Sequence, residues 1–360
     1  MKYKITLSLS FLIALCISLG CQKEQQEQKN AHESLSIGHE SRTIAFYGDK
    51  SITVPQVITK VASGWNAQNS IIAMLGYGDR IVATTNMIKA SPIFRKFVPS
   101  IKDAVICFVA SGELNIEGLL QAKPEVAFIP AGFGEQRFEQ LDQMGIPVAC
   151  LKANSLKNMV ERTVITGRIL GPDAYQRALQ YVDYYDHNVK RVVEKTSQIP
   201  KEKRIRVYHS MGNPLVTSGD SSLVQDWMDL AGVINIAKNW NVIRPGMSGH
   251  GNANLEQIID ADPEVIICMG AADADTIRTD PGWSSIQAVK DGKVYVNPRG
   301  MFLWCRETSE EALQFLWLAK TVYPHLFPEI DMSKETRHFY KTFYGYELSD
   351  DDVQLFLNPE

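Results

Sequence analysis

Two stretches of the sequence carry the same pattern and decide the fold. Residues 115–126 read Asn-Ile-Glu-Gly-Leu-Leu-Gln-Ala-Lys-Pro-Glu-Val, and residues 254–265 read Asn-Leu-Glu-Gln-Ile-Ile-Asp-Ala-Asp-Pro-Glu-Val. Asn, both Glu, Pro and Val match without a gap at an offset of 139 residues. Each copy predicts a short helix that ends before a proline and leads into a buried strand. The match in register indicates an internal duplication, and therefore two similar α/β lobes.

Short β-branched runs alternate with helical stretches on both sides of these copies. An opening hairpin is expected over residues 42–55, with its turn at Gly48-Asp49. The alternation of strands and helices is typical of βαβ units around a parallel sheet. The further strand candidates lie at residues 58–62, 81–84, 105–109, 126–129, 147–151, 205–209, 265–269 and 294–296.

One long helix is predicted between the lobes, over residues 172–198. Pro172 suits the first turn of a helix, and no Gly or Pro follows it before Pro200. About 25 residues at ~1.5 Å per residue give a strut of roughly 37 Å, which permits only limited relative movement of the lobes. Apolar residues recur along it at the helical spacing of three or four: Ala174, Ala178, Val182, Tyr185, Val189 and Val192.

The first forty residues are predicted to lie outside the fold. Lys2 and Lys4 precede an almost wholly apolar run over residues 5–19. At ~1.5 Å per residue this run spans roughly 22 Å, short of the ~30 Å hydrocarbon core of a bilayer. It is therefore typical of a signal peptide rather than a membrane-spanning helix. The polar stretch that follows, up to residue 41, has too little apolar surface to fold and is expected to be flexible.

The apolar run ends in Gly20-Cys21, and this ending resembles a bacterial lipoprotein signal. The resemblance implies that residues 1–20 are removed, that the thiol of Cys21 receives a lipid, and that residues 21–41 tether the folded body to a membrane. Ser18 stands where such signals usually carry a leucine, with Leu19 one place later. An ordinary cleaved signal peptide with a free Cys21 is therefore the alternative.

Composition and motifs exclude several classes of protein. With 37 basic and 41 acidic residues the formal net charge is −4, and no basic cluster of the kind that binds nucleic acid is present. Neither a CxxC pair nor Cys/His metal-ligand spacing occurs. A Gly-x-Ser-x-Gly nucleophile elbow and a complete GxGxxG are also missing, so we expect no enzyme. Nothing in the spacing supports a disulfide among Cys107, Cys150, Cys268 and Cys305.

The chain resembles the helix-linked class of substrate-binding proteins that serve ABC importers of iron-siderophores, haem and cobalamin. The resemblance covers residues 42 to about 320. It is carried by the hairpin ending in Val54-Pro55, both Asn-x-Glu…Pro-Glu-Val copies, Met74-Leu75-Gly76 to Asp79-Arg80-Ile81-Val82-Ala83, and residues 283–295, Trp-Ser-Ser-Ile-Gln-Ala-Val-Lys-Asp-Gly-Lys-Val-Tyr.

This resemblance implies two Rossmann-like lobes, each a mostly parallel sheet flanked by helices, joined by one long α-helix. The N-terminal lobe is expected over residues 42–171, the linking helix over 172–198 and the C-terminal lobe over 199–322. Residues 323–360 go beyond the family pattern. They are expected to form helices packed on the second lobe.

The resemblance also implies a function. The protein would be held outside the cytoplasm by its lipid, capture a metal chelate, and deliver it to a transmembrane permease coupled to a cytoplasmic ATPase. An iron-siderophore or haem is the first expectation; cobalamin, a nickel chelate and a molybdate-like oxyanion are the alternatives. No intrinsic cofactor is implied, and an ion would arrive already chelated, because no His-x-His or dense carboxylate set is visible.

Members of this class dock a glutamate of each lobe into arginine pockets of the permease. By motif these positions correspond to Glu117 and Glu256. Paired charges at a fixed separation favour orientation and association rate more than affinity. The alternative is that both are helix N-terminal residues stabilised by the helix dipole.

Candidate ligand contacts lie in the loops that follow strands, because ligands of open α/β sheets bind beyond the carboxyl ends of the strands. Aromatic side chains give flat apolar walls, and arginines bind carboxylates in bidentate fashion. For the two tryptophans and His209 the alternative is a position in the core. For the two arginines it is a surface salt bridge. The candidates are Trp65, Asn66, Phe133, His209, Met247, His250, Arg299, Trp304 and Arg306.

Two other classes would share this architecture. A metal-inserting chelatase would use His209 and His250 and would convert its chelate into product. A signalling or storage binder would need no docking glutamates.

Overall fold

The computed structural model describes residues 40–108, 114–132, 135–242 and 250–359, and the chain forms two units, residues 1–58 and 59–360. In the first unit, β1 (Ser41–Phe46) pairs antiparallel with β2 (Lys50–Pro55). Gly48 lies in the turn between them with a positive φ of 78°. The predicted hairpin is confirmed. It differs from the expected 42–171 lobe because these two strands form a sheet of their own.

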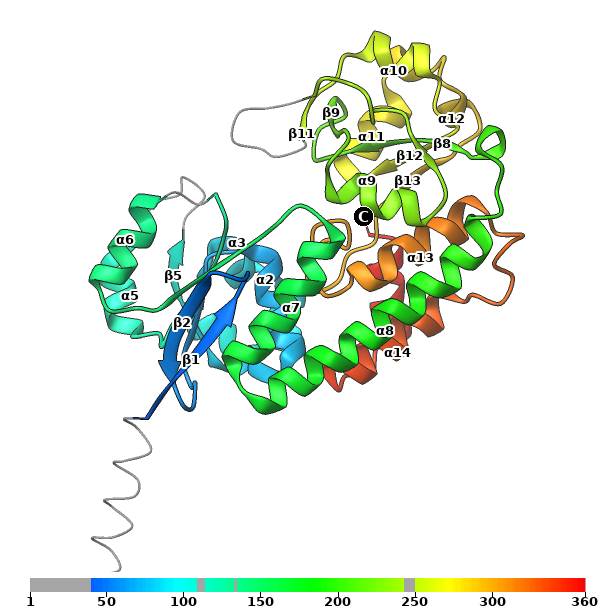
Figure 1. The fold of residues 1–360 in the computed structure, drawn as a ribbon. Coiled ribbons are helices and arrows are strands. Elements are labelled where there is room, and N and C mark those ends of the chain that lie inside the picture. The colour runs from blue at the N-terminus through cyan, green and yellow to red at the C-terminus, as the bar shows by residue number, and fades with distance from the viewer. Residues whose placement is uncertain (1–39, 109–113, 133–134, 243–249, 360) are drawn as a thin grey trace, which may run out of the picture. The chain divides into compact units, whose positions relative to one another are not determined.

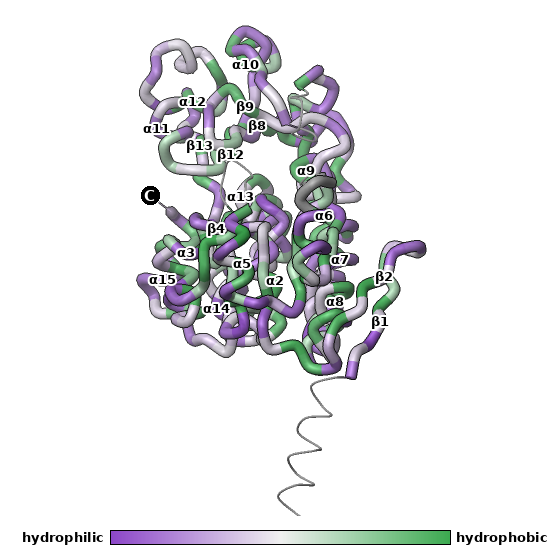
Figure 2. The backbone as a smooth tube through the Cα atoms, turned by 90° about the vertical axis from the view of Figure 1, so that its left-hand side faces the viewer, coloured by the Kyte–Doolittle hydropathy of each residue, from purple (hydrophilic) through white to green (hydrophobic). Residues whose placement is uncertain are grey.

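The first lobe of the second unit is built on a five-stranded parallel sheet with the order β5-β4-β3-β6-β7. Its edge strand β5 is labelled in Figure 1. Its strands are mostly buried, as parallel strands covered on both faces are, and β4 is green in the hydropathy view of Figure 2. The strands are β3 (Val61–Ser63), β4 (Ile81–Thr85), β5 (Val105–Phe108), β6 (Val126–Pro130) and β7 (Val148–Leu151).

Helices and short helical turns connect these strands. The α-helices are α2 (Asn66–Ile72), α3 (Asn86–Ala90), α4 (Pro92–Phe97), α5 (Ile116–Ala122), α6 (Glu135–Gln143) and α7 (Leu156–Leu170). The shorter turns are η1 (Ala73–Tyr77), η2 (Gly78–Arg80) and η3 (Pro99–Asp103).

The second lobe has a four-stranded parallel sheet with the order β10-β8-β12-β13. These strands are β8 (Arg206–Ser210), β10 (Ile234–Asn235), β12 (Val265–Cys268) and β13 (Val294–Val296). A separate antiparallel pair joins β9 (Val216–Ser218) to β11 (His250–Asn252). The sequence did not predict β9, β10 and β11, since strands this short are recognised only within an apolar run, such as the one that contains β13.

Five α-helices and two short turns complete this lobe. They are η4 (Lys201–Lys203), α9 (Leu223–Leu230), α10 (Leu255–Ala261), α11 (Ala271–Thr279), η5 (Pro281–Trp283), α12 (Gln287–Lys290) and α13 (Glu311–Val322).

The two copies of the repeated pattern occupy equivalent places in the two sheets. Asn115 and Asn254 cap α5 and α10, because each side chain accepts a hydrogen bond from the backbone N–H three residues later. Lys123 and Asp262 then end the helices in the left-handed conformation. The strands that follow, β6 and β12, lie second from the edge of their sheets. The prediction of two similar α/β lobes is confirmed.

The glutamate of each Pro-Glu-Val stretch holds the start of a neighbouring strand. The Glu125 carboxylate accepts hydrogen bonds from the backbone N–H groups of Thr59 and Lys60, at 2.6 and 3.0 Å. Glu264 accepts one from the backbone N–H of Arg206, at 3.0 Å. The strand predicted over residues 58–62 therefore begins only at β3, since Glu125 holds the backbone that precedes it.

The linking helix α8 (Pro172–Thr196) confirms the predicted strut, with 25 residues. Its buried stripe differs in detail, because Tyr181 and Asn188 are buried where the sequence predicted Val182 and Val189. Both polar groups reach the second lobe. The Tyr181 hydroxyl donates to a backbone carbonyl at 2.8 Å, and the Asn188 amide donates to another at 3.0 Å.

The chain ends in two further helices, α14 (Met332–Tyr344) and α15 (Asp350–Leu357). The helices are confirmed, but the expectation that they pack on the second lobe is incomplete. Phe97 of α4 lies 5.1 Å from the ring of Tyr340 and 6.3 Å from that of Phe356, and Lys96 pairs with Asp352 at 2.5 Å. The aromatic residues of this extension therefore pack on the first lobe and, through Phe339 and Phe343 against Tyr184, on the linking helix.

Within the described residues, no helix has the length and apolar character needed to cross a bilayer.

Candidate functional site

A cavity of about 320 Å³ lies between the two lobes. One wall comes from residues 87–92, on α3 and the start of α4, at the carboxyl end of β4. The other wall is the pocket loop, residues 299–303, which follows β13. Both walls thus lie beyond the carboxyl ends of parallel strands, where α/β sheets bind their ligands.

The lining of this cavity is apolar apart from one charged side chain. Seven of its ten residues are Met, Ile, Ala, Pro, Phe or Leu, and Arg299 is the single charged member. A guanidinium on an otherwise apolar wall suits a ligand that combines an apolar body with a negatively charged group.

Trp65 and Asn66, at the start of α2, are both half-buried and lie close to this cavity. The amide of Asn66 donates to the sulfur of Met87, a lining residue, at 3.4 Å, and its carbonyl accepts from the Thr85 hydroxyl at 2.6 Å. The ring of Trp65 stacks on the guanidinium of Arg162 at 3.9 Å. The structure therefore places Asn66 against a residue of the cavity wall, and Trp65 directly before it in the chain.

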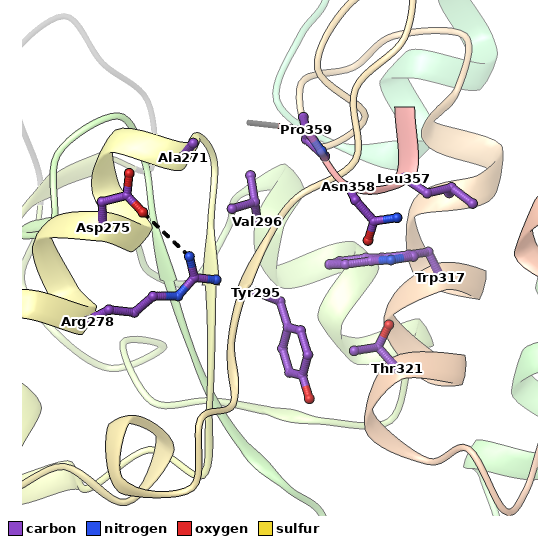
Figure 3. Close-up of a pocket in the computed structure, with 10 residues that line it drawn as sticks. All are labelled: Ala271, Asp275, Arg278, Tyr295, Val296, Trp317, Thr321, Leu357, Asn358 and Pro359. Atoms are coloured by element: carbon purple, nitrogen blue, oxygen red, sulfur yellow. Dashed lines mark ion pairs between the residues drawn. The ribbon is translucent and has the colours of Figure 1, made fainter. Parts of the chain in front are cut away.

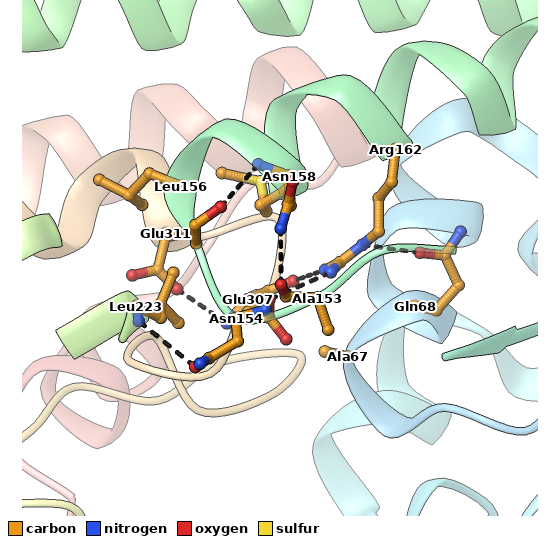
Figure 4. A network of polar contacts seen from close by, with 12 residues as sticks. Ala67, Gln68, Ala153, Asn154, Leu156, Asn158, Arg162, Leu223, Glu307 and Glu311 are labelled. Carbon is orange, nitrogen blue, oxygen red and sulfur yellow. Dashed lines mark hydrogen bonds and ion pairs between the residues drawn. The ribbon is translucent and has the colours of Figure 1, made fainter. Parts of the chain in front are cut away.

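Arg162, a residue that sequence reasoning missed, is fully buried in α7 and links the lobes (Figure 4). Its Nε donates to the Gln68 side chain of α2 at 3.1 Å. Its Nη1 forms an ion pair with the Glu307 carboxylate at 3.5 Å, and its Nη2 donates to the Glu307 carbonyl. Nothing local in the sequence distinguishes this arginine from a surface residue of a helix.

His209 and Trp304 are both fully buried and neither lines the cavity. The His209 ring lies edge-on to Trp227 of α9 at 5.3 Å, and neither ring nitrogen has a hydrogen-bond partner among the described residues. Burial, followed by the nearby charges of His250 and Arg306, lowers the pKa of His209 to about 3. His209 is therefore neutral at physiological pH.

The other predicted contacts are only partly placed. His250, on β11, is half-buried and its Nδ1 lies 2.5 Å from the Ser218 hydroxyl. Arg306 is also half-buried and lies close enough to act on His209. Phe133 and Met247 lie outside the described residues, as does Cys21.

The two predicted docking glutamates are exposed. Glu117 and Glu256 stand in the first turns of α5 and α10, directly after the capping asparagines. Their equivalent places in the two lobes follow from the duplication.

A second, larger cavity of about 530 Å³ belongs to the second lobe and the chain end (Figure 3). Its cation, Arg278, is engaged by Asp275 at 3.6 Å and by the Val294 carbonyl at 2.6 Å. No first-lobe residue lines it. The interlobe cavity is therefore the stronger candidate for the ligand site.

Metal ligands are scarce in the described residues. They contain no group of three or more His, Cys, Asp or Glu side chains that could hold an ion. Burial raises the pKa of the Cys107, Cys268 and Cys305 thiols to about 12, which disfavours the thiolate form that binds metals.

The comparisons with known proteins agree on one family. The model of the family described as "Periplasmic binding protein" matches residues 61–299. The molybdate-binding protein MolA of Haemophilus influenzae is 25% identical, over 85% of this chain and 91% of its own length. An iron-uptake system-binding protein of Bacillus subtilis is 23% identical, over 82% and 90%. An uncharacterised ABC transporter substrate-binding lipoprotein of the same bacterium is also 23% identical, over 91% and 100%.

Solved structures share the fold. MolA of Haemophilus influenzae with bound molybdate has a TM-score of 0.76 at 22% identity, over 86% of this chain and 99% of that one. CeuE of Helicobacter pylori with Ni(II) bound has a TM-score of 0.72 at 17% identity, over 88% and 99%.

The buried His209 gives a pH dependence of stability. Its pKa is lowered in the folded state, so the unfolded state binds more protons and stability falls as pH drops from about 6.5 towards 3. Between pH 7 and pH 5 this group alone should cost about 2 kcal/mol. Urea unfolding of the wild type and of His209→Phe, which keeps a ring against Trp227, should show this difference in their pH slopes.

The difference between the wild type and His209→Phe separates the contribution of His209 from that of groups whose effect on stability has the opposite pH dependence. Burial raises the pKa of Glu311 well above its ordinary value, so that group stabilises the fold as pH falls. Parallel pH profiles for the wild type and His209→Phe would show that His209 is not held neutral by burial.

Proposed function

As the chain belongs to the periplasmic binding protein family and is a substrate-binding protein of an ABC transporter, we propose that its ligand is a metal chelate held in the interlobe cavity. The family works outside the cytoplasm and passes ligand to a permease with its ATPase. An iron-siderophore or haem is the ligand class that we favour. Lipid anchoring at Cys21 is part of the same proposal.

The chemistry of the cavity lining supports a chelate. A bare oxyanion needs a shell of hydrogen-bond donors around it, since its charge must be compensated away from water. Here the lining is mostly apolar, with Arg299 as its charged member. A bulky anionic chelate would place its organic body on Met301 and Phe302 and its charge on the guanidinium.

Molybdate is the second candidate. The relative from Haemophilus influenzae is a molybdate-binding protein and matches most of this chain. At 25% identity its ligand need not be shared, and the mostly apolar lining supports the chelate over the oxyanion.

The predicted contacts divide by position. Arg299 lines the cavity and Asn66 contacts its lining residue Met87, so these two would touch the ligand first, with Trp65 beside them in the chain. His250 would contact the chelated metal through its imidazole. Phe133, Met247 and Arg306 remain proposed contacts, whereas His209 and Trp304 are buried away from the cavity and are not.

Titration calorimetry with a ligand panel tests this function. The panel comprises ferric tris-catecholate, ferric trihydroxamate, haem, cobalamin, a nickel–histidine complex and sodium molybdate. At least one chelate should bind with a Kd of about 1 μM or tighter, while molybdate should not. Arg299→Met should weaken an anionic chelate by about tenfold or more, because it removes a charge-assisted contact.

Arg278→Met is the matched control, since it removes an arginine from the second cavity instead. Binding of molybdate with no chelate bound would overturn the proposal in favour of an oxyanion. Release of free metal or of a metal-exchanged product would favour a chelatase. Equal loss in both arginine variants would remove Arg299 from the site.

The docking role of Glu117 and Glu256 is tested by charge reversal. Glu117→Lys with Glu256→Lys should reduce uptake of the bound chelate in cells by about tenfold or more, because like charges would face each other at the permease. Calorimetric binding should stay unchanged. Reversal of Glu139 on α6 and Glu202 in η4, both exposed, is the control. Undiminished uptake in the double variant would favour a signalling or storage binder.

Anchoring through Cys21 is tested by Cys21→Ser. The variant should be found in the soluble fraction or as an uncleaved precursor, because serine cannot receive the thioether-linked lipid. A tether of about 20 residues would otherwise keep the binding body near its permease and raise the local concentration. Membrane attachment that persists in Cys21→Ser would show that another element holds the protein.

A further inference from the structure

The backbone of the pocket loop, residues 299–303, is held by groups that lie beyond the matched family region. The Met301 N–H donates to the Glu310 carboxylate at 2.6 Å and to the Tyr340 hydroxyl at 3.0 Å. The Arg299 N–H donates to the Phe356 carbonyl at 2.9 Å. The match to the family model ends at residue 299, so both anchors on the C-terminal extension lie beyond the matched region.

Glu310 is the centre of these contacts. Its carboxylate is fully buried and accepts hydrogen bonds from four donors. They are the Met301 N–H and the hydroxyls of Tyr340, Thr308 and Ser309, at 2.6, 2.6, 2.6 and 2.7 Å. Four donors fill the acceptor sites of a carboxylate. Loss of one would leave buried polar atoms without partners, which is costly.

Gly300 shows independently how closely the loop approaches this cluster. A Cβ at this position would stand 2.0 Å from the Tyr340 hydroxyl oxygen and 2.6 Å from Glu310 Oε1. Any other residue would push the loop away from both groups. The close approach therefore requires glycine at this position.

Tyr340 is itself fixed. Its ring packs on Phe97 at 5.1 Å and on Phe356 at 5.2 Å, and the residue is fully buried. Burial raises the pKa of Tyr340 well above its ordinary value, so the phenol keeps the proton that it donates to Glu310. Packing thus holds the Tyr340 hydroxyl in place, and the hydroxyl connects the first lobe to the pocket loop.

We propose that Tyr340 is a positioning residue for the ligand site: with Glu310 it fixes the backbone of the pocket loop, and thereby the places of Arg299 and Phe302 in the interlobe cavity. The C-terminal extension is then part of the binding site. The effect on ligand rests on the proposed function, whereas the effect on the loop does not.

Hydrogen exchange tests the loop first, without any ligand. In Tyr340→Phe the Met301 amide should exchange about tenfold faster or more, because one of its acceptors is removed. Amides of β8, measured in the same sample, report any general loss of stability. Tyr185→Phe, which removes a hydroxyl from a buried tyrosine of α8 packed on Phe315, is the control and should leave Met301 unchanged.

Binding of ferric tris-catecholate, measured well below the unfolding temperature, tests the second step. Tyr340→Phe should weaken the Kd by about tenfold, mostly through a faster dissociation rate, while Tyr185→Phe should not. Gly300→Ala should act in the same direction, since its methyl group displaces the loop.

The outcomes separate the two proposals. Unchanged Met301 exchange in Tyr340→Phe and Gly300→Ala would overturn the positioning role, and so would faster exchange with unaltered binding. A wild-type protein that binds no chelate of the panel would overturn the proposed function, and the exchange result would then decide the role of Tyr340 in holding the loop.

Discussion

Buried polar contacts of one short stretch, the hub segment (residues 307–311), hold three parts of the fold in register. Glu307 pairs with the buried Arg162 of the first lobe. The Thr308 hydroxyl and the Ser309 N–H both form hydrogen bonds with the Ser70 hydroxyl of α2. Glu310 accepts a hydrogen bond from the Tyr340 hydroxyl of the C-terminal extension. Charges removed from water are tolerated only when they are paired and hydrogen-bonded, so each partner must keep its place.

The same segment limits relative movement of the lobes, so we expect the cavity to be largely preformed. The linking helix α8 donates from Tyr181 to the Ser309 carbonyl and from Asn188 to the Ala312 carbonyl. With a rigid helix and a buried polar cluster between them, the lobes have few ways to move apart. A site that exists before its ligand arrives avoids the entropy of ordering it, which favours affinity. Such a protein would keep α5 and α10, which carry the proposed docking glutamates, at a constant separation.

Sequence predicted those parts of the fold whose causes are local. Caps at Asn115 and Asn254, the prolines that follow, and the apolar stripe of α8 all lie within a few residues of the structure that they specify. Partners far apart in the chain left no such signal. Arg162 contacts a residue 145 positions away, and nothing near it distinguishes a buried arginine from an exposed one. The extension was misplaced for the same reason, since its position depends on Phe97 rather than on its own pattern.

The candidate site shows the same division. Loops after strands could be located from the sheet pattern, and with them Trp65, Asn66 and Arg299. Which side chains enter the cavity could not be predicted, because His209 near the carboxyl end of β8 and Trp304 in the loop after β13 are both buried in the core. The support of the pocket loop by Tyr340 spans 39 residues and depends on a single close approach at Gly300.

A distance measurement across the two lobes tests this account most directly. Spin labels at Leu120 on α5 and Asp260 on α10, both exposed, would report the separation of these two helices by pulsed electron paramagnetic resonance, with Cys21 and Cys150 replaced by serine. One narrow distance that ligand leaves unchanged, and that broadens in Arg162→Met, is the predicted result. A broad or two-state distribution in the otherwise unaltered protein would contradict it.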